Sequence, residues 1–350
     1  TLNTLFNKIE KHYKSKMPFV AYRKPNSLSI SGFFMDDNTL NFTSEFIETG
    51  FVFAPFKSEE NAVLFPLKNA EFINEDILIE EDFSFNTIFE HATNSDKEKH
   101  IHLVEKTLDE INNNELKKVV VSRKEEVLLS EFDVLITFKK LLKTYANAFV
   151  YVWFHPKVGL WFGATPETLL TISDHNFTTM SLAGTQVYVD TNEVIWKSKE
   201  LEEQQLVTDF IQNQLEPITS NLKIDKTETV KAGNLLHLRS SVEGHLNKSS
   251  NLKELIRKLH PTPAVCGLPR EKATLFINQN ENYKRTFYTG FLGELNFEDK
   301  NSSLFVNLRC MCIDGKKAFV YVGGGITKDS NAKKEWEETV AKTTTIKKVL

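Results

Sequence analysis

The sequence has few residues that could cross-link the chain and no segment that could cross a membrane. Its three cysteines, Cys266, Cys310 and Cys312, are an odd and low number, which favours a reducing compartment over a disulfide scaffold. None has partners at zinc-site spacing, so we interpret them as structural thiols. No apolar run approaches the roughly 20 residues that span a bilayer. The first segment begins at Thr1 rather than Met and lacks the apolar core of a secretory signal. We therefore expect a cytoplasmic protein without a membrane partner.

The chain also lacks a strong excess of charge and lacks internal repeats. Its 43 basic and 47 acidic residues give a formal net charge of −4, which provides no basic surface for nucleic acid. No period of about 20–50 residues recurs, which excludes a solenoid. Hydrophobic residues make up 41% of the chain and charged residues 26%. This balance is typical of a globular protein with a large core.

The patterns that are present combine long strands with a few long helices. Helix patterns cover about 96–113, 131–145, 193–216, 251–258 and 330–349. Strand patterns cover several segments of 18–93, and then 116–129, 149–189, 227–245, 287–297, 303–313 and 317–323. Many strands are joined by hairpin-length turns, and no linker rich in proline, glycine or serine divides the chain. We predict an α+β fold with large, mostly antiparallel sheets covered by outer helices, forming one domain over residues 1–350.

Two ionisable residues stand in segments that could bury them. Lys118 opens the valine-rich strand LKKVVVSR, and because strands alternate their faces, either Lys117 or Lys118 points inward. A buried lysine can serve as a general base, whereas a lysine at a strand start more often reaches solvent. Glu167 follows Pro166 in GATPETLL. Burial would raise its pKa and suit it to be a general acid, and a turn glutamate facing water is the alternative.

Two helix patterns carry pairs of carboxylates. Glu200 and Glu203 share one helical face, as do Glu335 and Glu338, with Lys342 one turn beyond. Two such pairs aimed at a common cleft would supply the oxygen ligands that Mg²⁺ prefers. Each pair taken alone is more often a solvated face.

Several further residues are candidates for binding an anion. In GGGIT, Gly324 and Gly325 lie between a strand and a helix, where backbone amides can approach a ligand. The segment has neither P-loop nor GxGxxG spacing. Gly184 and Thr185 end the glycine turn LAGT, which offers similar amides.

An arginine and a histidine complete the set of candidates. Arg309 lies inside the apolar segment LFVNLRCMCI, where it needs an anion or a structural acid. His260 opens the proline-rich loop HPTPAVCGLP and is either a ligand contact or a simple loop histidine. The sequence contains no HExxH or GxSxG motif and no assignable nucleophilic serine or cysteine.

In this order the motifs resemble those of the chorismate-binding enzymes, which include isochorismate, salicylate, anthranilate and aminodeoxychorismate synthases. The resemblance covers roughly residues 95–350, and 1–94 is similar to the more variable part of the same fold. The matching segments are KVVVSR, GATPE, LAGT, KELEEQQLV, HPTPAVCGLP, GFLGEL, NLRC, GGGI and EWEETVAK. Several motifs in the family's order are far more specific than any one of them.

The resemblance implies a role for each candidate. Lys118 would activate the attacking water, and Glu167 would protonate the departing C4 hydroxyl of chorismate. Mg²⁺ would be held by Glu203 and Glu338, with Glu200 and Glu335 in or near its shell. Substrate contacts would come from Gly184, Thr185, His260, Arg309, Gly324, Gly325 and Lys342. Because chorismate is a dianion, such an acidic site needs Mg²⁺ and cationic side chains to bind it.

Three features bear on which reaction the family resemblance implies. Ala183 stands where the similar aminodeoxychorismate enzymes carry a lysine, and the loop reads HPTPA where anthranilate synthases typically read HPTG. Salicylate synthases usually replace that loop segment. These features favour isochorismate synthase over anthranilate synthase component I or salicylate synthase. A non-catalytic carboxylate-binding protein is the alternative outside the family. We expect the protein to be a monomer or a weak homodimer. Gln204 departs from the family, which more often has a histidine there, and this puts the partner of Glu203 in doubt.

Overall fold

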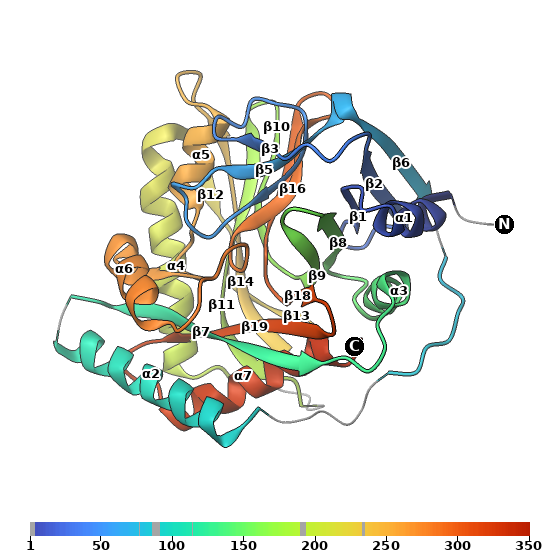
Figure 1. Ribbon diagram of the computed structural model, residues 1–350. Coiled ribbons are helices and arrows are strands. Elements are labelled where there is room, and N and C mark those ends of the chain that lie inside the picture. The colour runs from blue at the N-terminus through green and yellow to red at the C-terminus, as the bar shows by residue number, and fades with distance from the viewer. Residues whose placement is uncertain (1–3, 77, 86–91, 114, 190–193, 233–234) are drawn as a thin grey trace.

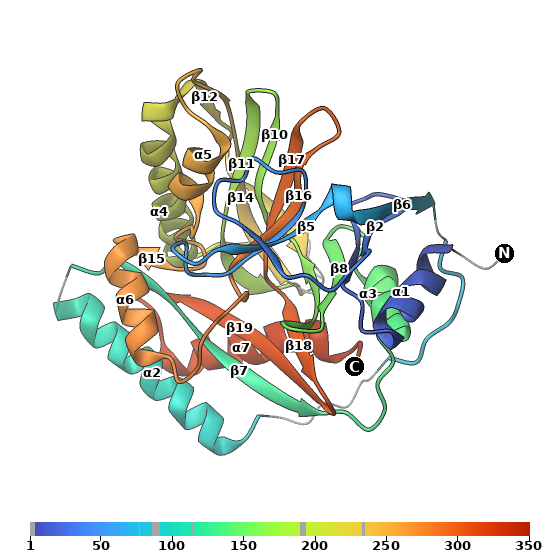
Figure 2. The ribbon, with the colours of Figure 1, turned by 45° about the horizontal axis from the view of Figure 1, so that its top comes forward.

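Two large β-sheets form the centre of the molecule, and helices lie on their outer sides (Figures 1 and 2). The computed structural model describes residues 4–76, 78–85, 92–113, 115–189, 194–232 and 235–350. Every strand pair within these residues is antiparallel. The predicted α+β class, with large antiparallel sheets under outer helices, is therefore confirmed. In the described part of the chain, no helix is long and apolar enough to span a membrane.

The first sheet has nine strands in the order β15-β7-β19-β18-β9-β8-β1-β2-β6. Their bounds are β1 (Phe19–Arg23), β2 (Ser29–Met35), β6 (Ala70–Asp76), β7 (Lys118–Leu128), β8 (Phe149–His155), β9 (Gly159–Thr165), β15 (Gly267–Leu268), β18 (Cys310–Asp314) and β19 (Lys317–Ile326). Helices α1 (Thr4–Lys14) and α3 (Val134–Thr144) pack on β1, β2, β8 and β9. Helices α2 (Asn94–Asn113), α6 (Arg270–Asn280) and α7 (Ala332–Lys347) pack on β7 and β19.

The second sheet has ten strands, nine of them in the order β12-β14-β11-β10-β17-β16-β4-β5-β3, with β13 also paired to β14. Their bounds are β3 (Asn41–Thr43), β4 (Gly50–Ala54), β5 (Ala62–Pro66), β10 (Thr168–Ser173), β11 (Asn176–Val187), β12 (Thr219–Ile224), β13 (Glu228–Ala232), β14 (Leu235–Leu246), β16 (Phe291–Phe297) and β17 (Asn301–Val306). Helices α4 (Ser198–Leu215) and α5 (Leu252–Leu259) lie on its outer side. Short 3₁₀ helices cover Leu67–Asn69 and Glu216–Ile218.

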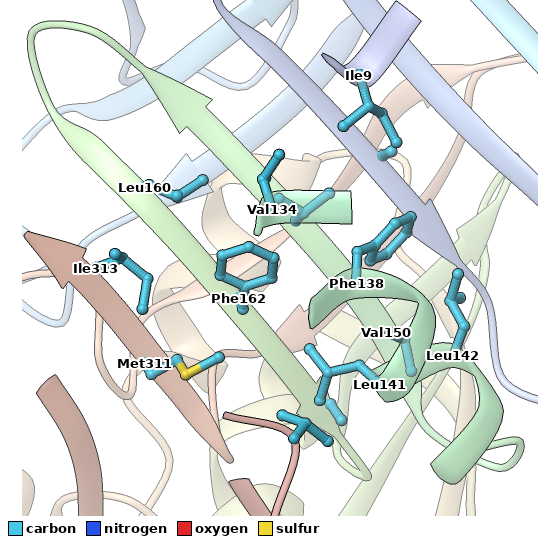
Figure 3. Packing of buried hydrophobic residues seen from close by; sticks show 14 of the residues in the cluster. Ile9, Val134, Phe138, Leu141, Leu142, Val150, Leu160, Phe162, Met311 and Ile313 are labelled. Atoms are coloured by element: carbon cyan, nitrogen blue, oxygen red, sulfur yellow. The ribbon is translucent and has the colours of Figure 1, made fainter. Parts of the chain in front are cut away.

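Separate hydrophobic clusters join these layers. An aromatic cluster fills the space between the sheets, where Phe53 stacks on Phe287 at 4.3 Å and Phe65 on Trp153 at 5.0 Å between ring centroids. On the outer face of the first sheet, α3 inserts Phe138 and its neighbours against strands β8, β9 and β18 (Figure 3). Burial of apolar area at roughly 25 cal/mol per Å² makes these layers the main favourable term for folding.

Local sequence explains where the helices begin. Asp133, Asn251 and Asn331 each accept a hydrogen bond from a backbone amide in the first turn of α3, α5 and α7, which is the preferred arrangement at a helix N-terminus. Four of the predicted helices are confirmed with small shifts of their ends. The fifth is α4, which begins at Ser198, and the predicted start at residue 193 lies outside the described residues. The short helices α1 and α6 were not predicted.

The strand predicted over 303–313 is wrong as a single element. The chain leaves the second sheet at the end of β17 and enters the first sheet at β18, so Arg309 lies in the crossover with a φ of 47°. The glycines of GGGIT are also placed differently from the prediction. Gly323, Gly324 and Gly325 lie inside β19, paired with β7, and not at the start of a helix.

Candidate active site

A cleft of about 700 Å³ lies where β7 and β19 of the first sheet approach β11 and β14 of the second, beside helices α4 and α7. It brings together nine of the residues proposed from the sequence. They are Glu167, Gly184, Thr185, Glu203, Arg309, Gly324, Gly325, Glu338 and Lys342. Segments far apart in the chain thus meet at one site, which the sequence alone could only suggest through the order of its motifs.

Lys118 lies directly behind the cleft wall. Its side chain is fully buried, and its Nζ is 2.9 Å from Oε1 of Glu203 on helix α4. Lys117 on the opposite face of the strand is exposed. Of the two arrangements that the sequence left open, the structure therefore shows the inward one, and Lys118 does not reach solvent.

The glycines of β19 make room for this ion pair. A Cβ atom on Gly325 would lie 2.3 Å from Oε1 of Glu203 and 2.9 Å from Cε of Lys118. A Cβ atom on Gly324 would lie 3.3 Å from Oε2 of Glu335. Real Cβ atoms almost never approach other atoms below 3.0 Å, so any larger residue at position 325 would force the Glu203 carboxylate and the end of the Lys118 side chain to move.

Glu167 follows β9 and is buried, with only 4% of its surface exposed. Burial raises its pKa to about 8, although the nearby charges of Lys118 and Arg309 act in the opposite direction. The carboxyl group is therefore protonated at neutral pH. A protonated acid facing a cleft is the state that a general acid requires.

Two acidic residues of helix α7, Glu335 and Glu338, are each paired with a lysine. Glu335 lies 2.5 Å from Lys199, and Glu338 lies 2.5 Å from Lys342. Lys342 also donates a hydrogen bond of 3.0 Å to the carbonyl of Gly323. These pairs bridge α4, α7 and β19 and leave the site close to charge balance.

Burial and these lysines set the ionisation of the carboxylates. Burial acts to raise the pKa of Glu203, but Lys118 and Lys199 hold it below its ordinary value. Burial and the neighbouring Glu338 raise the pKa of Glu335. The buried Oε2 of Glu335 has no hydrogen-bond partner among the described residues. A buried oxygen without a hydrogen bond costs free energy. This arrangement therefore fits a site in which a bound ion or ligand supplies the missing partner.

Two further proposed residues, Glu200 and His260, are not among those that line the cleft. Glu200 accepts a hydrogen bond of 3.2 Å from the backbone amide of Lys197 and so caps helix α4. His260 is buried beside Phe291, with its Nε2 3.1 Å from the carbonyl of Pro55, and burial lowers its pKa to about 4. Their side chains are used within the fold, so we leave both out of the proposed ligand contacts.

One cleft residue was missed from the sequence. His237 on β14 lies with Nδ1 3.0 Å from the carbonyl of Gly184 and Nε2 3.3 Å from Nη2 of Arg309. Burial and Arg309 lower its pKa to about 3. The neutral ring therefore carries its proton on Nδ1 and accepts from Arg309 at Nε2. A histidine inside the apolar run NLLHL was the only signal in the sequence.

The sequence profile of the chorismate binding enzymes matches residues 60–350 of this chain. The chain belongs to this family. Its strands β7 and β19 and helices α4 and α7, which build the cleft, all fall within the matched part.

Individual members of the family are similar to this chain over part of their length. Isochorismate synthase MenF of Bacillus subtilis (strain 168) is 31% identical over 264 residues, which are 72% of this chain and 55% of that protein. Isochorismate synthase EntC of Escherichia coli (strain K12) is 30% identical over 197 residues, 54% of this chain and 50% of that protein. The chain thus spans about half the length of these curated relatives.

Solved structures of the family share the fold. A putative 2,3-dihydroxybenzoate-specific isochorismate synthase, DhbC from Bacillus anthracis, superposes with a TM-score of 0.82, 23% identity and 99% of both chains covered. Anthranilate synthase component I from Streptococcus pneumoniae gives 0.69 with 18% identity, covering 94% of this chain and 92% of that one. At these identities the likeness establishes the fold, which is shared by relatives with different reactions.

Proposed function

We propose that this chain is an isochorismate synthase, which converts chorismate to isochorismate. The observation that carries the proposal is a single cleft flanked by a buried lysine, Lys118, and a protonated carboxyl group, Glu167. Moving a hydroxyl group from C4 to C2 of the ring needs a base for the attacking water and an acid for the departing hydroxyl. The names of several relatives as isochorismate synthases support the same reaction.

The groups at the cleft account for every proton that the reaction moves. Lys118 acts as the base once it is neutral and no longer paired with Glu203. The neutral amine accepts a proton from the water as the water oxygen bonds to C2, the ring double bonds shift, and the C4–O bond breaks. Glu167 gives a proton to the departing hydroxyl, which leaves as water. The enolpyruvyl group is untouched, so the product is an isomer of the substrate. Ala183 lies in the cleft wall, at the position where the similar aminodeoxychorismate enzymes carry a lysine, so no amine projects into the cleft from this position.

Arg309 and Lys342 are the cleft cations that we propose for the substrate carboxylates. Both line the cleft, and within the described residues Arg309 has no ion-pair partner, since its Nη2 contacts only the neutral His237. An arginine at such a position is stabilised by an incoming carboxylate, which its planar guanidinium binds with two hydrogen bonds.

We also propose that the site takes Mg²⁺. The supporting observations are that Glu203 and Glu338 line one cleft and that Oε2 of Glu335 is buried without a partner. In the described residues no three His, Cys, Asp or Glu side chains are grouped closely enough to hold a metal. The donor chemistry fits Mg²⁺, which keeps several ligands from water or substrate. When bound, the ion would neutralise a substrate carboxylate that Glu203 and Glu338 would otherwise repel.

Product identification tests the reaction directly. The purified protein is incubated with chorismate and Mg²⁺, with and without ammonium, and the products are examined by mass spectrometry and NMR. We expect an isomer of unchanged mass, formed equally in both buffers, and its loss in EDTA with recovery on adding Mg²⁺. Anthranilate formed with ammonium would assign anthranilate synthase instead, and salicylate with pyruvate would assign salicylate synthase. Saturable binding of unchanged chorismate would indicate a binding protein.

A further inference from the structure

A second cavity, of about 1660 Å³, adjoins the cleft. The two share four lining residues, Pro166, Leu182, His237 and Arg309. The contact between Arg309 and His237 therefore lies on the boundary between the two spaces. We call the second space the outer cavity, and it is bordered by β13, β14 and the segment between α3 and β8.

The charges that line the two spaces differ. The cleft is lined by charges of both signs, the carboxylates Glu203 and Glu338 and the cations Arg309 and Lys342, together with the protonated Glu167. The outer cavity is lined by the cations Lys231, Arg239 and Arg309, and among the residues that the structure describes no aspartate or glutamate lines it. A cavity lined by charge of one sign concentrates ligands of the opposite sign and speeds their association.

The three cations are not equally free to meet a ligand. Arg239 donates two hydrogen bonds, of 2.9 and 2.6 Å, to Oε1 of Glu228, so its charge is largely compensated. Lys231 lies 3.5 Å from the ring centroid of Tyr188, and among the described residues it has no carboxylate partner. Arg309 likewise has no carboxylate partner there. In the described part of the chain, two cations without a carboxylate partner thus line the outer cavity, Lys231 on β13 and Arg309 at its boundary with the cleft.

We infer that the outer cavity is the route by which the dicarboxylate substrate reaches the cleft. Lys231 attracts the dianion first, and Arg309 then receives one carboxylate and passes the ring into the cleft. The inference rests on the proposed function for the identity of the substrate. It assigns Lys231 a part in substrate capture that the chemistry of the cleft does not require.

The test compares two charge reversals on neighbouring positions, Lys231→Glu and Lys226→Glu. Lys226 is exposed, precedes β13 and lies outside the outer cavity, so both variants carry the same change in net charge. Association of chorismate is followed by stopped-flow fluorescence with Mg²⁺ present, using Trp161, which stacks on the cleft residue Tyr321. Each rate is measured from low to about 1 M salt, where screening reduces the Debye length to about 3 Å.

We expect Lys231→Glu to lower the association rate constant by about tenfold at low salt. The difference should disappear at high salt, with kcat unchanged, and Lys226→Glu should behave like the wild type. Equal association rates in the two variants would overturn the inference while leaving the reaction intact. A wild-type protein that neither binds nor converts chorismate would overturn the proposed function, and this inference with it.

A neutral variant tests the route independently of charge. Ala232 lines the outer cavity and not the cleft, so Ala232→Phe narrows the route without changing charge. We expect it to slow association and dissociation by the same factor and leave the Kd unchanged, because an obstruction raises the barrier in both directions. Unchanged rates in a variant with wild-type Tm would show that the substrate enters elsewhere.

Discussion

Each of three glutamates at the site lies beside a lysine in the unliganded protein. Lys118 pairs with Glu203, Lys199 with Glu335, and Lys342 with Glu338. Burial opposes the charge on Lys199, but Glu335 and Glu338 together raise its pKa above the ordinary value. The lysines therefore stabilise the ionised carboxylates in the absence of a cation, and Mg²⁺ would have to compete with them for the same oxygens.

The first residue-scale prediction concerns the base and the acid. We expect Lys118→Ala and Glu167→Gln each to lower kcat by about 10²–10⁴-fold, because that is the usual contribution of a positioned proton-transfer group. Steady-state kinetics measure the effect, and circular dichroism confirms the fold. Lys117→Ala on the exposed face of the same strand is the control. Near-wild-type turnover in either variant would remove that residue from the mechanism.

The pKa of Glu167 gives a second prediction, on pH. Since burial raises this pKa from 4.5 to about 8, the acid loses its catalytic proton as the pH rises through about 8, and kcat should fall there. The free energy of unfolding should change with pH in the same direction as kcat. Between about pH 4.5 and 8 the folded state binds more protons than the unfolded state, so the free energy of unfolding should decrease as pH rises. Glu167→Gln should flatten both profiles, and a basic limb that persists in it would assign the titration to another group.

At this scale the sequence identified nine residues of the cleft but could not give their surroundings. Alternation along the strand LKKVVVSR left both lysines possible, because the choice depends on which face α2, α6 and α7 cover. His260 was proposed from its place in a motif, yet its ring lies beneath Phe291. His237 was missed since a single histidine in an apolar run carries no sign of the arginine that it meets.

At the scale of the element, β19 is unusual because it carries three consecutive glycines inside a ten-residue strand. We predict that Gly325→Ala destabilises the protein by about 1–3 kcal/mol, the usual cost of overpacking, since the new Cβ would meet Glu203 and Lys118. Urea denaturation measures the change. In a Glu203→Ala background the same substitution should cost much less, because the obstructing carboxylate is gone. Equal costs in both backgrounds would contradict this account of the glycine.

The helices were more predictable than the strands. Helices α3, α5 and α7 follow capping residues, and α3 and α5 also carry a clear apolar face, so local sequence determines where they form. The segment 303–313 reads as one apolar strand because both of its halves are buried. Only the three-dimensional arrangement shows that it changes sheets at Arg309, where φ is positive. The change of sheet does not interrupt the run of apolar residues, so the periodicity of the sequence could not reveal it.

At the scale of the whole molecule, the aromatic cluster between the sheets fixes their separation and thereby the width of the cleft. Phe53 is fully buried and contacts Trp153, Trp161 and Phe287. We predict that Phe53→Ala lowers the free energy of unfolding by about 3–5 kcal/mol, as expected for deleting a buried phenyl ring. Chemical denaturation measures it. Leu275→Ala, on the exposed side of α6, should cost less than about 0.5 kcal/mol, and a similar loss in both variants would argue against a specific role for the cluster.

The order of strands has a consequence for how the protein is made. In the second sheet β16 and β17 stand between β10 and β4, and in the first sheet β18 stands between β19 and β9. All of these joining strands come after residue 290, so the ribosome delivers them long after β4, β9 and β10. Until then the N-terminal strands β3, β4 and β5 have no partner linking them to the rest of their sheet, and β9 has one open side. A growing chain therefore exposes strand edges of the kind that pair with other chains, and we expect it to need protection during synthesis that the folded chain does not need.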